Sequence, residues 1–213
     1  MGAWLAAVQY IQANSTRFIQ AVEVHLWLSA AALLIAAAIC VPLGILTSRS
    51  RSSAAVALGI INTLRVIPSL AIILIVFPFL GLGPRPALLA LIVLACPPIL
   101  VNTDAGFRNV DPAIVEAARG MGMTQGQVLA RVELPLALPV LLTGIRIALV
   151  QNVGLVTIAA LIGAGGLGAF VFQGIGQTAM DLVLLGAIPT MVLAFSASIL
   201  LDALIESIDR VRT

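Results

Sequence analysis

The chain has 213 residues, of which 61% are hydrophobic and only 9% are charged, so a soluble domain could not bury all of its apolar side chains. The net charge of +2 is small and no basic run is interleaved with aromatic residues, which argues against nucleic-acid binding. Because about 20 apolar residues cross a bilayer, the length allows five or six crossings in one membrane domain.

Apolar runs in chain order predict an all-α, polytopic membrane protein with one transmembrane domain over residues 1–213. The five predicted spans cover residues 22–47, 54–80, 87–107, 134–162 and 180–208. Arg65 and Pro68 interrupt the second span, which predicts a kink, and Pro97 and Pro98 lie at the centre of the third. A tight turn is expected between these two spans, at Gly81, Gly83, Pro84 and Pro86.

The polar residues 108–133 predict a segment outside the bilayer. Asp111 is a candidate N-cap before Pro112 at the first helical position, and the helix is expected to break near Gly120 and Gly122. We therefore expect two short helices joined by a turn. Such a segment suits docking into a groove of a soluble partner, although it could also merely link the third and fourth spans.

The arginines predict the orientation in the membrane, since the more basic side is cytoplasmic. With five crossings, one side carries Arg49, Arg51, Arg108, Arg119, Arg131, Arg210 and Arg212, and the other carries Arg17 and Arg85. This count places the N-terminus outside, the C-terminus and segment 108–133 in the cytoplasm, and the glycine-rich stretch 163–168 on the outer side. Residues 1–20 are mixed in character, so no cleaved signal peptide is expected.

Arg65 and Arg146 lie within predicted spans, where each costs about 2.5–3.5 kcal/mol unless it faces protein or water. Asn102, Asp104 and carbonyl groups freed by prolines are the expected acceptors, and a structural role is favoured over substrate contact. Polar residues of the fourth span are candidates for the translocation pathway, although such residues also join helices. The full set of pathway candidates is Arg65, Pro68, Ser69, Gln151, Asn152 and Thr157.

The sequence GAGGLG at 163–168 satisfies G-x-G-x-x-G, but a dinucleotide site needs a preceding strand, which is not predicted here. A tight turn or gate is favoured instead, built by Gly163, Gly165, Gly166 and Gly168.

Single reactive residues offer little support for an enzyme or a metal site. His25 lies beside Glu23 and Trp27 in what reads as an interfacial region, so a structural role is expected. Cys40 and Cys96 sit in apolar runs, which favours neither a disulfide nor a zinc site. No catalytic motif or metal-ligand cluster is present, so neither catalysis nor a cofactor in this chain is expected.

One motif in the polar segment points to a family. The sequence EAARGMG is followed by nine residues and then VELP, and it resembles the E-A-A, three residues, G, nine residues, I-x-L-P signature of ATP-binding-cassette importer permeases. The matching positions are Glu116, Ala117, Ala118, Gly122, Leu134 and Pro135, with Val132 in place of the usual isoleucine. The phrases IPSLAI (67–72) and GMGMTQGQ (120–127) are similar to permeases for glycine betaine, carnitine or choline. Methionine-importer permeases share the five-span core and GAGGLG, and are the nearest alternative.

The resemblance implies a permease of the bacterial cytoplasmic (inner) membrane whose coupling helix docks in a cleft of an ATPase. Glu116 would pair with a basic group there, Ala117 and Ala118 would allow close approach, and Gly122 would permit the turn. Arg119, Met121 and Met123 complete the expected ATPase-coupling surface.

The implied partners are two cytoplasmic ATPase subunits that bind ATP and Mg, a second permease copy or paralogue, an extracytoplasmic substrate-binding protein and membrane lipid. The chain itself has no Walker motif. An ion-coupled carrier or channel, and an intramembrane enzyme, remain alternatives.

Overall fold

The computed structural model describes residues 3–210, without the side chains of residues 3, 4, 62 and 208–210, and this part of the chain contains helices and no strand. The elements are α1 (Ala3–Ala13), α2 (Ser15–Ser48), α3 (Arg51–Val66), α4 (Ser69–Leu80), α5 (Pro84–Arg108), α6 (Pro112–Gly120), α7 (Gln125–Val128), the π-helix η1 (Leu129–Glu133), α8 (Leu134–Ala159), the 3₁₀-helix η2 (Ala160–Ile162), α9 (Gly168–Gln177) and α10 (Met180–Arg210). Four helices are long and apolar enough to cross a membrane, and the α3–α4 pair gives a fifth if it forms one span. The predicted all-α fold with about five spans is confirmed.

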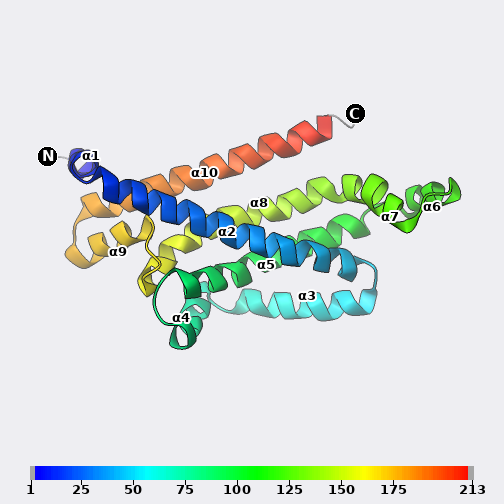
Figure 1. Cartoon of the computed structure of the whole chain (residues 1–213), viewed down its shortest axis with the longest axis horizontal. Helices are drawn as coiled ribbons and strands as arrows, with labels where there is room; N and C mark the ends of the chain where they lie inside the picture. Colours follow the sequence, from blue (N-terminus) through cyan, green and yellow to red (C-terminus); the bar gives the residue numbers. More distant parts are fainter. Residues whose placement is uncertain (1–2, 211–213) are drawn as a thin grey trace.

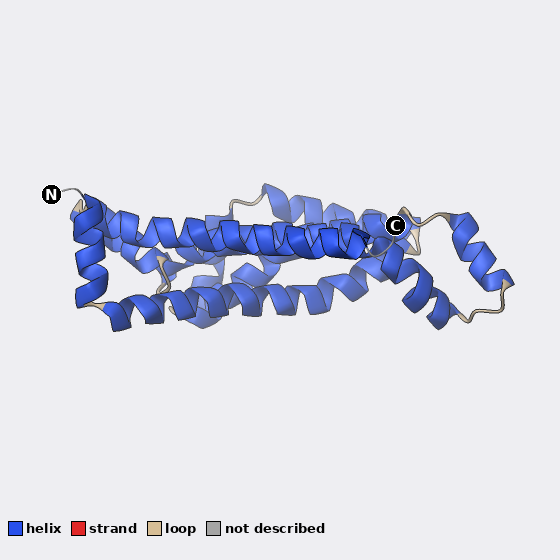
Figure 2. Cartoon of the chain, turned by 90° about the horizontal axis from the view of Figure 1, so that it is seen from above, coloured by secondary structure: helices blue, strands red, loops and turns tan. Residues whose placement is uncertain are grey.

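The long helices α2, α5, α8 and α10 form an elongated bundle (Figure 1). α5 packs between α2 and α8 and is the most buried of the spans, while α10 lies on α8 and α9. Glycines let α5 approach its neighbours closely: a Cβ at Gly44 would lie 2.6 Å from Thr103 Cβ, and one at Gly144 would lie 2.6 Å from Asn102 Cβ. The α6–α7 segment projects beyond the end of this bundle (Figure 2).

The second predicted span, over 54–80, consists of two helices with a break at Pro68, where the sequence predicts a kink. α3 and α4 meet at an angle of 94°. Pro68 cannot donate a helical hydrogen bond, and Ile67 before it is extended, with φ −73° and ψ 124°. The turn expected after this region is confirmed, since Gly81 and Gly83 have φ of +76° and +120° and Pro84 begins α5.

The fourth span also differs from its predicted start at residue 134. One helical stretch runs from Gln125 to Ile162 and includes the π-turn η1. In a regular α-helix the ring of Pro135 would clash with the carbonyl group of Arg131, and a wider turn relieves that clash. Two short helices, α1 and α9, were not predicted at all, and α2 begins at Ser15, earlier than expected.

Neither arginine within the predicted spans pairs with the acceptors expected for it, and Arg65 belongs to none of the ion pairs in the described part of the chain. Arg146 of α8 pairs with Asp202 of α10. The expected acceptors are engaged elsewhere, since Asp104 pairs with Arg108 at 2.7 Å and the Asn102 amide donates to the Pro98 carbonyl oxygen at 2.8 Å.

The two cysteines are free thiols that pack in one apolar cluster between α2 and α5. Of the arginines used to predict orientation, Arg212 lies outside the described residues.

Candidate functional site

The projecting segment folds through local signals at each helix end. The Asp111 carboxylate accepts a hydrogen bond from the Ala113 amide at 2.8 Å, and Pro112 is the first residue of α6. α6 ends in a Schellman motif, in which the amide of Gly122 bonds the Arg119 carbonyl oxygen at 2.9 Å. Gly122 has φ +84°, a conformation in which a side chain is strained. The first short helix and the turn after it were therefore correctly predicted, whereas the second helix is the beginning of the long stretch from Gln125 to Ile162.

The second short helix begins at once, because Thr124 and Gln127 form a capping box. The Thr124 hydroxyl accepts from the Gln127 amide at 3.4 Å, and the Gln127 side chain accepts from the Thr124 amide at 2.9 Å. The phrase GMGMTQGQ thus encodes a helix stop followed by a helix start.

α6 presents a mixed acidic and apolar surface outside the bundle. Glu116, Ala117 and Arg119 are exposed, whereas Ala118 is buried and Met123 is partly buried. Met121 is 77% exposed, and Glu116 forms no ion pair with the described residues. Exposed large apolar side chains beside an unpaired carboxylate are typical of a docking surface for another protein.

Ionic contacts fix the base of this segment to the end of α2. The Arg49 guanidinium donates to both carboxylate oxygens of Glu133, at 2.7 and 2.5 Å. Glu133 is 5% exposed, and the contact raises the pKa of Arg49. Arg108 donates to the Thr47 carbonyl oxygen at 2.5 Å, so a second link joins α5 to α2. Arg49, Glu133 and Arg119 also line a cavity of about 470 Å³. The arginine count gave no hint of these pairings.

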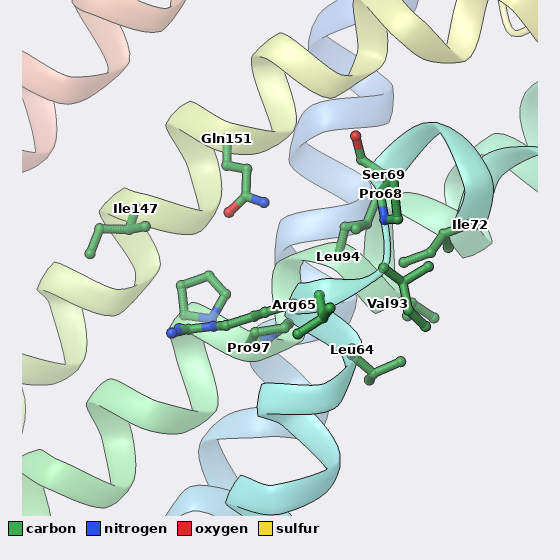
Figure 3. Close-up of a pocket in the computed structure, with 13 residues that line it drawn as sticks. Leu64, Arg65, Pro68, Ser69, Ile72, Val93, Leu94, Pro97, Ile147 and Gln151 are labelled. Atoms are coloured by element: carbon green, nitrogen blue, oxygen red, sulfur yellow. The ribbon is translucent and has the colours of Figure 1, made fainter.

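A second cavity, of about 610 Å³, lies at the break between α3 and α4, and it brings together four of the six pathway candidates. The described residues that line it include Arg65, Pro68, Ser69 and Gln151, with Pro97 and Pro98 from α5. In Figure 3, Gln151 extends from α8 toward the space that the Arg65 side chain enters. We refer to this space as the break cavity.

The other two pathway candidates do not line the break cavity. Asn152 is fully buried on the packed face of α8, and neither of its side-chain polar atoms has a hydrogen-bond partner in the described part of the chain. The Thr157 hydroxyl is likewise buried without a partner there. The polar stripe predicted on the fourth span is therefore divided between a cavity and the protein interior.

The glycine-rich stretch forms a tight turn after α8. Gly163, Gly165 and Gly166 have φ of +79°, +80° and +74°. Gly168 begins α9, and a Cβ there would lie 2.2 Å from the Thr157 carbonyl oxygen. A helix precedes the turn, not the strand that a dinucleotide site needs, so the favoured interpretation as a turn is confirmed.

His25 holds this turn against the bundle. It is fully buried, and its contacts agree with the structural role expected for it. Its Nδ1 accepts from the Leu167 amide at 3.3 Å, which leaves Nε2 to donate to the Val153 carbonyl oxygen at 2.9 Å. The sequence, in which a single histidine lies in an apolar run, did not predict these two hydrogen bonds. No group of three or more metal-ligating side chains occurs in the described part of the chain.

Comparison with known proteins places the chain in a family. Residues 40–210 match the family described as "Binding-protein-dependent transport system inner membrane component", and the chain belongs to this family. It is therefore a permease subunit of an ATP-binding-cassette importer and a component of the inner membrane.

Comparison with individual proteins indicates which members of the family the chain resembles. The chain is 42% identical to the carnitine transport permease protein OpuCB of Listeria monocytogenes, covering 89% of this chain and 87% of the relative. It is 37% identical to the choline transport system permease protein OpuBB of Bacillus subtilis, covering 88% and 86%. Its fold is similar to an inward-facing structure of the MetNI methionine ABC transporter, with a TM-score of 0.80, 24% identity, and coverage of 91% of this chain and 97% of that one.

Proposed function

We propose that this chain imports a compatible solute of the quaternary-amine class, such as glycine betaine, carnitine or choline. The observation that carries the proposal is the similarity, over nearly the whole length, to permeases named for carnitine and choline. The methionine transporter structures are only 24% and 25% identical to the chain, well below the permeases for carnitine and choline, so methionine import is the second candidate. An ion-coupled carrier would have no use for the projecting α6–α7 segment.

The energy for import comes from two separate ATPase subunits that bind ATP and Mg, and α6 is the docking element. In this arrangement Glu116 pairs with a basic group of the ATPase, and Ala117, Arg119, Met121 and Met123 surround that contact. The exposure of Glu116 and Met121 supports the assignment. The segment then lies in the cytoplasm, the N-terminus outside, and the glycine turn beside the outer gate.

The rest of the complex follows from the same proposal. The chain forms one transmembrane domain that pairs with a second permease copy or a paralogue. An extracytoplasmic binding protein delivers the solute with high affinity.

Substrate uptake tests the proposal directly. The chain is reconstituted in proteoliposomes with its ATPase and binding protein, and uptake of radiolabelled glycine betaine, carnitine, choline and methionine is measured with and without ATP. We expect ATP-dependent uptake of at least one quaternary amine and none of methionine. Uptake that proceeds without ATP would contradict the proposal, and uptake of methionine alone would favour the second candidate.

The docking assignment has its own test in Glu116→Ala. Loss of the carboxylate should lower ATPase co-purification and uptake together, because the exposed side chain has no role inside the permease. Glu23→Ala is the matched control, since Glu23 is also an exposed glutamate but lies near the N-terminal end of α2, outside the α6–α7 segment. Unchanged uptake in Glu116→Ala would remove Glu116 from the docking contact.

A further inference from the structure

The break cavity holds one charge that the protein does not neutralise. Arg65 is the only charged residue among the described residues that line the cavity, and it belongs to none of the ion pairs in the described part of the chain. Arg146, the other arginine within a span, pairs with Asp202. A volume of about 610 Å³ lies in the range of binding sites for small organic molecules. An unpaired guanidinium in such a cavity indicates a ligand that brings its own negative charge.

The wall formed by α5 offers the opposite polarity. Pro97 and Pro98 have no amide hydrogen, so the carbonyl groups of Val93 and Leu94, four residues earlier, lack their usual helical donors. Val93 and Leu94 also line the cavity. The lining residues therefore combine a positive guanidinium of α3 with two residues of α5 whose carbonyl groups lack a helical donor.

A quaternary ammonium group alone would be poorly recognised here. The described residues that line the cavity include no aromatic side chain, so they cannot form the cage that best holds such a cation. A permanent cation without an acidic group would also be repelled by Arg65. A small zwitterion avoids both problems, because its carboxylate can meet the guanidinium.

We propose that the break cavity selects solutes that carry a carboxylate, which Arg65 binds, while the cationic end faces the carbonyl groups of Val93 and Leu94. The inference rests on the proposed function and narrows it. Glycine betaine and carnitine carry a carboxylate and a quaternary ammonium group. Choline carries the ammonium group and a hydroxyl, so the permease should discriminate against choline even when a binding protein delivers it.

Uptake by the reconstituted complex tests this inference, with glycine betaine, carnitine and choline compared at saturating binding protein. The unchanged complex should prefer the two carboxylates. Arg65→Gln removes the charge and should lower glycine betaine and carnitine uptake about tenfold or more, with little loss for choline, because one charge-assisted contact is removed. Arg65→Lys keeps the charge and should retain the preference for carboxylates. Arg85→Gln, an exposed arginine outside the cavity, is the matched control and should leave all three rates unchanged.

Membrane abundance and ATPase co-purification of each variant separate selectivity from misfolding. An equal loss of all three solutes in Arg65→Gln and Arg65→Lys would give Arg65 a structural role and overturn the inference. Equal rates for choline and glycine betaine in the unchanged complex would also overturn it while leaving the proposed function intact. Failure to take up any of the three would refute the proposed function itself.

Discussion

Removing either partner of the contact between Arg49 and Glu133 should cost a different amount of stability, because the two side chains differ in exposure. The Glu133 side chain is 6% exposed, while that of Arg49 is 45% exposed. Arg49→Met leaves a buried carboxylate without its two hydrogen bonds, whereas Glu133→Met leaves a guanidinium that can turn toward water. The two changes should therefore have unequal effects.

Breaking a buried pair costs about 3–5 kcal/mol, and partial access of water to Arg49 places the expected cost of Arg49→Met near 2 kcal/mol. Glu133→Met should cost less than about 1 kcal/mol, because the exposed arginine is readily solvated. The double variant should resemble Glu133→Met, since no buried charge then remains unpaired.

Hydrogen–deuterium exchange at the backbone amides of residues 125–134 measures the loss of local stability that each substitution causes. A cost of about 2 kcal/mol corresponds to roughly 30-fold faster exchange in Arg49→Met. Amides of α10, which packs on α8 and α9, serve as the internal reference. Faster exchange in Glu133→Met than in Arg49→Met would refute the reasoning, as would a double variant that exchanges as fast as Arg49→Met.

Two glycine substitutions provide further tests with controls inside the same helix. Gly168→Ala should destabilise the permease by about 1–3 kcal/mol, because the new Cβ would lie 2.2 Å from the Thr157 carbonyl oxygen. Gly176→Ala, also in α9, is the control: its Cβ would have no neighbour within 4 Å, so this change should be neutral or stabilising. Unfolding of the purified permease in SDS gives both values, and equal stability of the two variants would contradict the packing. Gly122→Ala should destabilise the α6–α7 turn by about 1 kcal/mol, since φ is +84° there, while Gly120→Ala at the end of α6 should not. Amide exchange at residues 118–124 distinguishes them, and equal exchange would show that the turn tolerates a side chain.

The parts of the fold that depend on contacts between residues close together in the sequence could be predicted from the sequence. Asp111 and Pro112 mark the start of α6, and Gly122 marks its end, because capping contacts join residues only a few positions apart. Long apolar runs likewise located the spans. The start of the fourth span was missed because loss of hydropathy does not end a helix, and glutamine, arginine and glutamate are good helix formers.

Contacts between distant residues could not be predicted in this way. Arg146 and Asp202 lie on different helices, and His25 of α2 contacts Leu167 of the glycine-rich turn, and no pattern along the chain pairs these residues. Pro68 indicated a disturbance, but the 94° angle depends on how α3 and α4 pack against α5. The pathway candidates were chosen by polarity alone, so Asn152 was grouped with Gln151 although one lies in the interior and the other at a cavity.

The continuous helical stretch from Gln125 to Ile162, which includes the π-turn η1 and ends in the 3₁₀-helix η2, has a mechanical consequence. Its 38 residues form a rod about 57 Å long that joins the α6–α7 segment at one end to the glycine turn at the other. Pivoting such a rod about one end by only 10° would swing the opposite end through roughly 10 Å, a distance set by its length. A small rotation of this stretch about its α6–α7 end would therefore be enough to move the far turn by the width of a small solute.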